Sequence, residues 1–112
     1  MSMLKRREKR RYLAILHSVH PHDNIREDLI ILNSITKRNS ELFGHISTEL
    51  SYIRLIRSEQ KNIIIISCLL QHIDNILSTI ALIDPPLITI VISGTLKKLR
   101  RHLQKILDNA YL

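Results

Sequence analysis

Histidines are the side chains whose grouping in this sequence best suits chemistry. A short bend holds three imidazoles and a carboxylate, from His17, His20, His22 and Asp23. Such groups are ligands for Zn²⁺ or Ni²⁺. Structural zinc sites usually draw their ligands from two separated pairs, and neither Cys68 nor a second histidine pair completes such a set. The sequence therefore predicts no metal site and no cofactor.

A second pattern with catalytic potential joins Arg38 to His45, which are separated by six residues, with Asn39 directly after the Arg. In a small all-helical chain, this spacing resembles the Arg-to-His motif of HEPN-type ribonucleases. The resemblance covers residues 38–45 and implies a dimer in which the Arg and His of two protomers face each other. It also implies RNA cleavage without metal, with His45 in proton transfer and Arg38 on the scissile phosphate. Ser47 stands where this family often has an aromatic residue.

Other catalytic signatures are lacking in the sequence. The two glycines, Gly44 and Gly94, cannot build a Gly-rich phosphate loop, and no Ser, His and Asp set or carboxylate pair stands out. A non-enzymatic protein is therefore favoured, with a HEPN-like ribonuclease as an alternative.

The net charge of +7 is concentrated at the two ends of the chain. Lys and Arg side chains placed in this way can contact phosphates and release counterions, which indicates a surface for a polyanion, above all nucleic acid. An acidic protein or an anionic membrane face would suit these charges equally well, and solvated helix faces are the alternative without a function. The candidate nucleic-acid-binding residues are Lys5, Arg6, Arg7, Lys9, Arg10, Arg11, Lys97, Lys98, Arg100, Arg101 and Lys105.

Aromatic side chains that could stack on bases are scarce. Tyr12, Phe43, Tyr52 and Tyr111 are scattered along the chain, which disfavours base-specific recognition of RNA or single strands. No helix-turn-helix pattern is convincing either. Contact with the nucleic-acid backbone is the form of binding that remains.

The elements that must position these residues are predicted from apolar periodicity. The strongest signal is the stretch of residues 62–83, whose apolar side chains recur at steps of three and four and predict a central helix. Further helices are predicted over residues 4–18, 24–36, 40–57 and 96–107, with a break favoured at residues 58–62. Residues 84–86, Asp-Pro-Pro, mark the firmest boundary. Residues 87–92 are rich in β-branched side chains, but the lack of a second convincing strand favours the start of a helix there.

Together these elements predict an all-α fold, a small antiparallel bundle of four to five amphipathic helices. Residues 1–112 are expected to form a single helical domain with a basic N-terminal segment, residues 1–11. The central helix is apolar on nearly every side. This excess favours a homo-oligomer or a complex with a helix of a partner protein.

The localisation of the protein is predicted from the polar residues that interrupt its apolar segments. Polar residues 71, 72, 74 and 75 break the central stretch well before the roughly 20 apolar residues that a membrane span needs. Cys68 stands alone in that stretch, where a small buried hydrophobe is a better interpretation than a reactive thiol. Without a recognisable targeting segment, an intracellular protein, cytoplasmic or nuclear, is expected.

The sequence thus favours a small binding or assembly protein. Its apolar helices would serve self-association or a partner protein, and its basic ends would bind a polyanion. A protein adaptor or structural subunit with no role in nucleic-acid binding is the other alternative.

Overall fold

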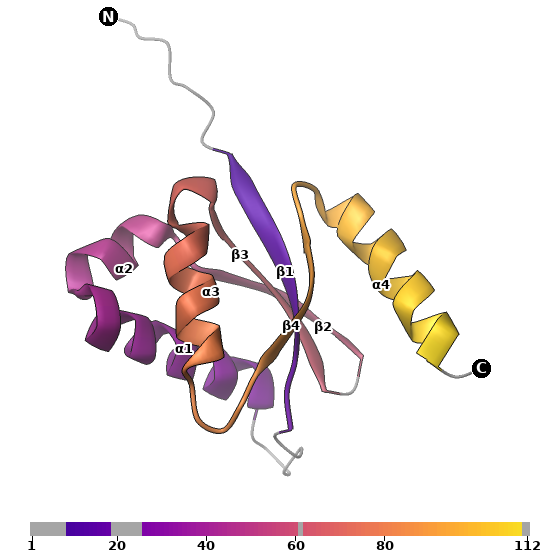
Figure 1. Ribbon diagram of the computed structural model, residues 1–112, viewed down its shortest axis with the longest axis horizontal. Coiled ribbons are helices and arrows are strands. Elements are labelled where there is room, and N and C mark those ends of the chain that lie inside the picture. Colours follow the sequence, from indigo (N-terminus) through magenta and orange to yellow (C-terminus); the bar gives the residue numbers. More distant parts are fainter. Residues whose placement is uncertain (1–8, 19–25, 61, 111–112) are drawn as a thin grey trace, which may run out of the picture.

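The computed structural model describes residues 9–18, 26–60 and 62–110, and these form a mixed α/β fold (Figure 1). The predicted all-α helical bundle is therefore wrong. The strands are β1 (Arg10–Leu16), β2 (Arg54–Gln60), β3 (Ile63–Leu69) and β4 (Ile88–Ser93). The helices are α1 (Glu27–Phe43), α2 (His45–Ser51), α3 (Ile73–Ala81) and α4 (Leu96–Ala110), and a 3-10 turn, η1 (Leu70–His72), leads into α3.

The four strands form one sheet in the order β2-β3-β1-β4, and every neighbouring pair is antiparallel. Apart from the short α2, the chain runs β-α-β-β-α-β through this sheet, which is the ferredoxin-like arrangement. β1 and β3 are the central strands, and β2 and β4 are the edges. α4 is an addition that follows the last strand.

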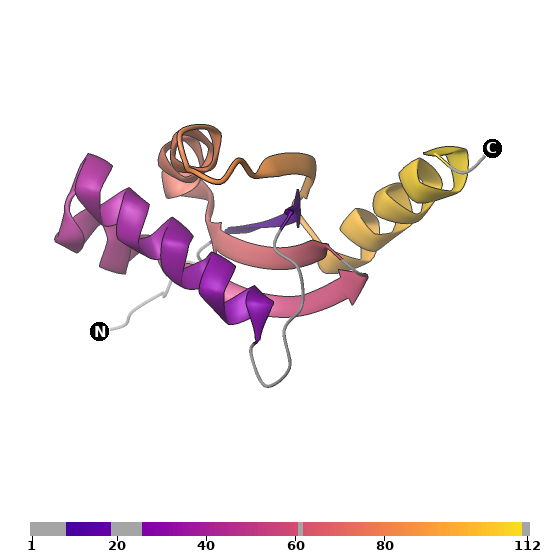
Figure 2. The same cartoon turned by 90° about the horizontal axis from the view of Figure 1, so that it is seen from below.

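The sheet is covered on both faces (Figure 2). α1 and α3 pack on one face, where their apolar side chains meet those of alternate strand residues such as Leu13 and Ile66. α4 packs on the other face, where Leu99 and Leu103 meet Ile65. Two apolar cores therefore lie back to back, and the central strands contribute side chains to both.

The first half of the predicted central helix is the strand β3, all seven residues of which are buried. The run Ile63–Ile66 is apolar at every position, so it matches a helix period and a strand buried on both faces equally well. β-branched side chains favour the extended form, and pairing with β1 and β2 stabilises it. Only the second half of the stretch forms a helix, α3.

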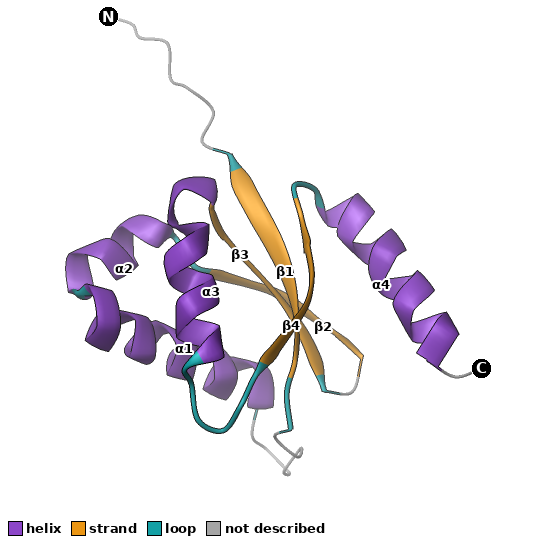
Figure 3. Cartoon of the chain, viewed as in Figure 1, coloured by secondary structure: helices purple, strands orange, loops and turns teal. Residues whose placement is uncertain are grey.

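Three more predicted helical segments are wholly or partly strands (Figure 3). Residues 10–16, predicted within a helix over residues 4–18, form β1. Residues 54–57, predicted as the end of the third helix, begin β2, and residues 88–93 form β4. A strand at residues 87–92 was disfavoured because the sequence offered no second strand to pair with it. The strand that pairs with β4 is β1, near the other end of the chain.

Other predicted elements are confirmed. α4 begins at Leu96, and the Asp-Pro-Pro segment separates α3 from β4. The break favoured at residues 58–62 is shorter than predicted and joins two strands, because β2 continues to Gln60 and β3 begins at Ile63. The predicted second helix exists as α1 but continues to Phe43, and the cap predicted at Asn24 lies outside the described residues. Gly44, placed inside a helix by the sequence, has a φ of 95° and separates α1 from α2. Glycine adopts this left-handed region without the strain that other residues suffer there.

A buried hydrogen-bond chain ties the three helices of the first layer together. The Asn39 side chain of α1 donates from Nδ2 to Thr48 Oγ1 of α2 over 2.8 Å. Its Oδ1 accepts from Thr79 Oγ1 of α3 over 2.7 Å. Because all three side chains are buried, these bonds satisfy groups that water cannot reach. They fix the orientation of the short helix α2.

Candidate nucleic-acid interface

Arg10, at the start of β1, is held in place by two hydrogen bonds. Its guanidinium Nη2 donates to the carbonyl oxygen of Tyr52 over 2.6 Å and to Ser67 Oγ over 3.0 Å. These bonds join β1 to β3 and to the residue that follows α2. The partly buried Arg10 side chain thus stabilises the sheet, and it also places a positive charge at the start of β1.

The next residue, Arg11, brings the N-terminal charges to the other basic segment. Because β4 pairs with β1 through Tyr12 and Ser93, the turn that leads into α4 lies beside the start of β1. A Cβ atom at Gly94 would lie 3.3 Å from Arg11 Nη1. The two basic segments, at opposite ends of the sequence, therefore meet at one end of the sheet.

The first turn of α4 is fixed by Thr95. Its Oγ1 accepts a hydrogen bond from the Lys98 backbone N–H over 3.2 Å, and its carbonyl oxygen accepts one from the Leu99 N–H over 3.1 Å. A Thr in this position satisfies backbone donors that otherwise lack partners at the start of a helix. These bonds stabilise the first turn of α4, which carries Lys97 and Lys98.

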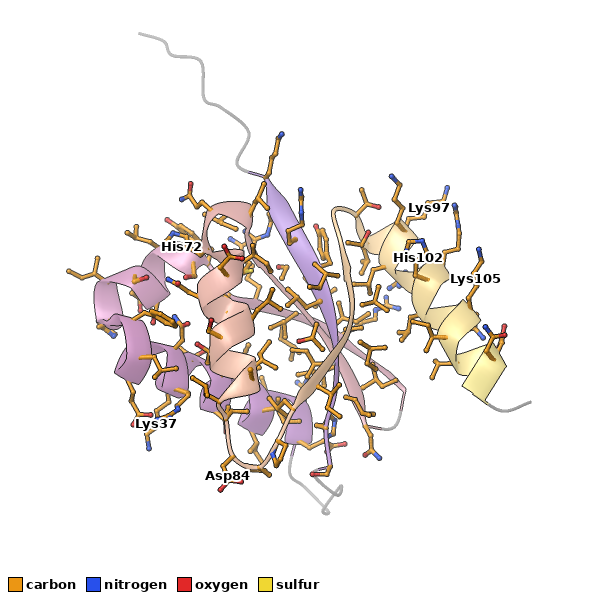
Figure 4. All side chains as sticks on the ribbon, viewed as in Figure 1. Lys37, His72, Asp84, Lys97, His102 and Lys105 are labelled. Carbon is orange, nitrogen blue, oxygen red and sulfur yellow. The ribbon has the colours of Figure 1, made fainter. Side chains whose placement is uncertain are left out.

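α4 buries Leu99 and Leu103 against the sheet and turns most of its charges outward. Lys97 and Lys105 extend from the helix on the side away from the sheet (Figure 4). The first turn contains basic residues and no acidic one, although the helix dipole disfavours positive charge there by a few tenths to about 1 kcal/mol. The positive charge of this first turn therefore does not stabilise the helix.

Two arginines that the sequence analysis missed lie on the same face of the sheet. Arg54 of β2 stands opposite Ser67, the residue that Arg10 bonds, and Arg57 stands opposite Ile65. Both are exposed. Their membership of this face is visible only once residues 54–60 are recognised as a strand, because it follows from the pairing of β2 with β3.

The acidic side chains that the structure describes are distributed differently. Those of α1, α2, α3 and the loop before β4 all lie in the first helical layer or at its edge: Glu27, Asp28, Glu41, Glu49, Asp74 and Asp84. On α4, the described acidic residue is Asp108, in the last turns of the helix. The face that carries α4 is therefore strongly positive. The opposite layer is negative, because Arg26, Lys37 and Arg38 are its described basic residues against these six acidic ones.

We define the basic surface as the basic side chains of this face together with Lys9 and Arg11, which lie at the end of the sheet where β1 meets the turn before α4. It contains eight of the predicted nucleic-acid-binding residues and the two added arginines: Lys9, Arg10, Arg11, Arg54, Arg57, Lys97, Lys98, Arg100, Arg101 and Lys105. The predicted residues Lys5, Arg6 and Arg7 lie outside the described residues. None of the helices in the described part of the chain is long and apolar enough to cross a membrane.

The histidine cluster is only partly covered by the structure, since His20, His22 and Asp23 lie outside the described residues. Within the described ranges, no group of three or more His, Cys, Asp or Glu side chains could hold a metal ion. His17 is buried at the end of β1, and its Nδ1 has no hydrogen-bond partner among the described residues. Burial lowers the pKa of His17 below its ordinary 6.5, against an opposing pull from Glu27 and Asp28.

We expect His17 to make the protein less stable in mild acid. The unfolded chain takes up the proton at about pH 6.5, whereas the folded chain resists it. The contribution of His17 is therefore complete above that pH and is lost as the pH falls toward the lower folded pKa. Urea unfolding at about pH 7.5 and about pH 5.5 should show a larger loss of stability for the native protein than for His17→Gln. Equal losses would contradict this assignment.

The residues of the HEPN-like pattern make separate contacts. Arg38 Nη1 lies 3.5 Å from Glu41 Oε1 on α1, and His45 Nε2 lies 3.9 Å from Glu49 Oε1 on α2. The all-helical setting on which that resemblance depended is wrong. Cys68 is confirmed as a buried residue, and burial raises the pKa of its thiol to about 11, which keeps it protonated and unreactive.

Comparison with known proteins shows a shared fold and no family. No protein-family model matches the sequence, and no curated protein matches it. Among solved structures, the chain is similar to a chain in the cryo-EM structure of yeast ribonuclease MRP, with a TM-score of 0.54 and 12% sequence identity. The similarity covers 96% of this chain and 95% of that chain. The protein thus shares its whole mixed α/β fold with a component of that structure.

Proposed function

We propose that this protein is a non-enzymatic RNA-binding subunit that contacts the RNA backbone through the basic surface. The observation that carries the proposal is the meeting of the two ends of the chain. Arg11 of β1 lies against Gly94, in the turn before α4, so that the two basic segments are neighbours at one end of the sheet.

The character of this surface favours phosphate over base contacts. Its described side chains are Lys and Arg, while Tyr12 is partly buried against the apolar core under α4. Lys and Arg that contact phosphates provide affinity and position without reading the sequence. The chain of similar fold belongs to the structure of a ribonuclease, which supports RNA over DNA as the ligand. Within such an assembly, the protein would hold RNA in place in an intracellular complex.

Removal of two charges from the basic surface should weaken RNA binding and reduce its salt dependence. Lys97→Ala with Arg101→Ala is expected to weaken the binding of a structured RNA by about tenfold, or ~1.4 kcal/mol. The slope of the logarithm of affinity against the logarithm of salt concentration should fall by roughly 2, because each lost phosphate contact no longer releases its counterions. Filter binding across a salt series measures both quantities.

The matched control is Lys37→Ala with Arg38→Ala, which removes two positive charges from the solvent side of α1 in the opposite layer. This variant should bind RNA with nearly native affinity and slope. Equal weakening by both double variants would assign the binding to net charge and refute the basic surface. The RNA should remain uncut throughout, and cleavage lost on His45→Ala would instead support the nuclease alternative.

A further inference from the structure

A small pocket is formed by α1, α2 and the start of the edge strand β2. It has a volume of about 230 Å³ and is lined by Thr36, Thr48, Glu49, Tyr52, Ile53 and Arg54. Pockets for drug-sized ligands usually measure roughly 300–1,000 Å³. Because this pocket is smaller, it suits a single planar ring system better than a larger ligand.

An aromatic residue, Tyr52, lines this pocket. It is 48% exposed, so about half of its surface is open to a ligand. Its backbone has a φ of 48°, in the left-handed region, where a bulky residue is unusual and glycine is unstrained. Residues held in such conformations gather at binding sites. The conformation of Tyr52 therefore agrees with a role for its ring in binding.

Two arginines of the basic surface adjoin Tyr52. Arg54 lines the pocket itself, and Arg10 donates to the carbonyl oxygen of Tyr52 over 2.6 Å. Arg54 also stands opposite Ser67, whose hydroxyl accepts the second hydrogen bond of Arg10. The pocket thus lies at the border of the basic surface, and a nucleotide whose base entered it would have its phosphate beside Arg54.

Glu49 gives the same pocket a carboxylate, on a side chain that is 73% exposed. A free phosphate does not suit the pocket, because this carboxylate would repel it. A positively charged side chain could stack on Tyr52 and pair with Glu49, but Arg10 and Arg54 would repel it. A nucleotide suits both kinds of charge, since its neutral base can donate to the carboxylate and its phosphate can bind arginine.

The two oxygens of a carboxylate favour one base over the others. Guanine has two adjacent donors on its Watson–Crick edge, N1–H and the N2 amino group, and a carboxylate can accept a hydrogen bond from each. The other bases place at least one acceptor beside their donor, and this acceptor would face a carboxylate oxygen. In a duplex the same edge is occupied by the paired cytosine, so an unpaired guanine is required.

We propose that this pocket binds an unpaired guanine of the RNA, with Tyr52 stacked on the base, Glu49 accepting its two donors and Arg54 at the adjacent phosphate. The inference rests on the proposed function, to which it adds one base-specific contact at the border of the basic surface. Stacking provides affinity for any base, and the carboxylate provides the preference for guanine.

Mononucleotides test the pocket without the rest of the RNA. In NMR titrations of the full chain with up to about 10 mM nucleotide, GMP should shift the backbone amides of residues 48–54, with a dissociation constant on the order of 1 mM. AMP, which differs in the base alone, should shift these amides only weakly. Lys97→Ala with Arg101→Ala should leave the GMP shifts unchanged, because both side chains lie on α4.

Two RNA hairpins that differ in one unpaired nucleotide, G or A, test the pocket within RNA. The native protein should bind the G hairpin about tenfold more tightly than the A hairpin. Glu49→Gln should abolish this preference, because an amide offers one acceptor where guanine needs two. Glu41→Gln is the matched control, since Glu41 is an exposed carboxylate of α1 that does not line this pocket, and it should keep the preference.

Substitutions of Tyr52 test the stacking. Tyr52→Phe keeps the ring and should bind the G hairpin within about twofold of the native affinity, whereas Tyr52→Gly should weaken it about tenfold. Glycine fits the left-handed backbone, so the second variant should remain folded, which circular dichroism verifies. Neither variant should change the slope of affinity against salt concentration, because neither removes a phosphate contact.

Three results would overturn the proposal. The first is an absence of GMP shifts at residues 48–54, and the second is an equal response there to GMP and AMP. The third is equal affinity for the two hairpins despite a response to GMP, which would assign the pocket to a free nucleotide. Failure of the proposed RNA function looks different, because neither hairpin would then show salt-dependent binding that Lys97→Ala with Arg101→Ala weakens.

Discussion

Replacement of Ile65 or Ile66 by Ala should each lower the free energy of unfolding by about 3 to 4 kcal/mol. These adjacent residues of β3 are both fully buried, Ile65 in the core under α4 and Ile66 in the core under α1 and α3. Each substitution removes apolar contacts and leaves a cavity in a packed interior. For a chain of this size, either loss is a large part of the total stability.

Urea unfolding followed by circular dichroism measures both variants. The control is Ile46→Ala, which makes the same chemical change at a 76% exposed position and should alter stability by no more than about 0.5 kcal/mol. A large loss for Ile66→Ala with a small one for Ile65→Ala would show that the second face of the sheet is not covered, and would contradict the position of α4.

The second large effect is expected for Asn39→Ala, which should lower the free energy of unfolding by about 3 kcal/mol. The substitution removes the bonds to Thr48 and Thr79 and leaves two buried hydroxyl groups without these partners. Both hydroxyls keep a bond to a backbone carbonyl, of Gly44 and Asn75 respectively, so the penalty is smaller than for complete isolation. The link between α1, α2 and α3 is nevertheless lost.

Asn33→Ala provides the comparison, because Asn33 is an exposed residue of the same helix. Ala is the better helix former, so this control should be neutral or slightly stabilising. Hydrogen exchange should also show faster exchange within α2 for Asn39→Ala, since this helix depends on Thr48 for its attachment. If both Asn variants have native stability, the buried chain of hydrogen bonds contributes nothing to the fold.

Most residues of the candidate interface were named from the sequence, but their arrangement in space was not predicted. The helix α4 that carries the C-terminal charges was predicted correctly, because Leu99 and Leu103 recur at helical spacing between Lys and Arg residues. Arg54 and Arg57 were missed because their segment was taken for a helix. The contact between Arg11 and Gly94 could not be predicted, since it exists only because β4 pairs with β1.

The difference between local helix patterns and long-range strand pairing also explains why the fold class was predicted wrongly. The four successive isoleucines of residues 63–66 carry no period of their own, so they fit a buried helix and a buried strand alike. The excess of apolar surface that was attributed to an oligomer interface is largely explained by a strand with a core on each side. The exposure of Ile46 and Leu50 on α2 was equally hidden, because both look like core residues in the sequence.

The sequence by itself determined what depends on neighbours within a few turns: the amphipathic helix α4, the boundary at the paired prolines, and the concentration of positive charge at both ends of the chain. A helix bonds each N–H to a carbonyl four residues earlier, so its pattern is local. The tertiary structure alone decided which segments are strands, which face each one presents, and that the two basic ends meet. Strands bond to partners far away in the sequence, so their identity depends on contacts that only the folded chain creates.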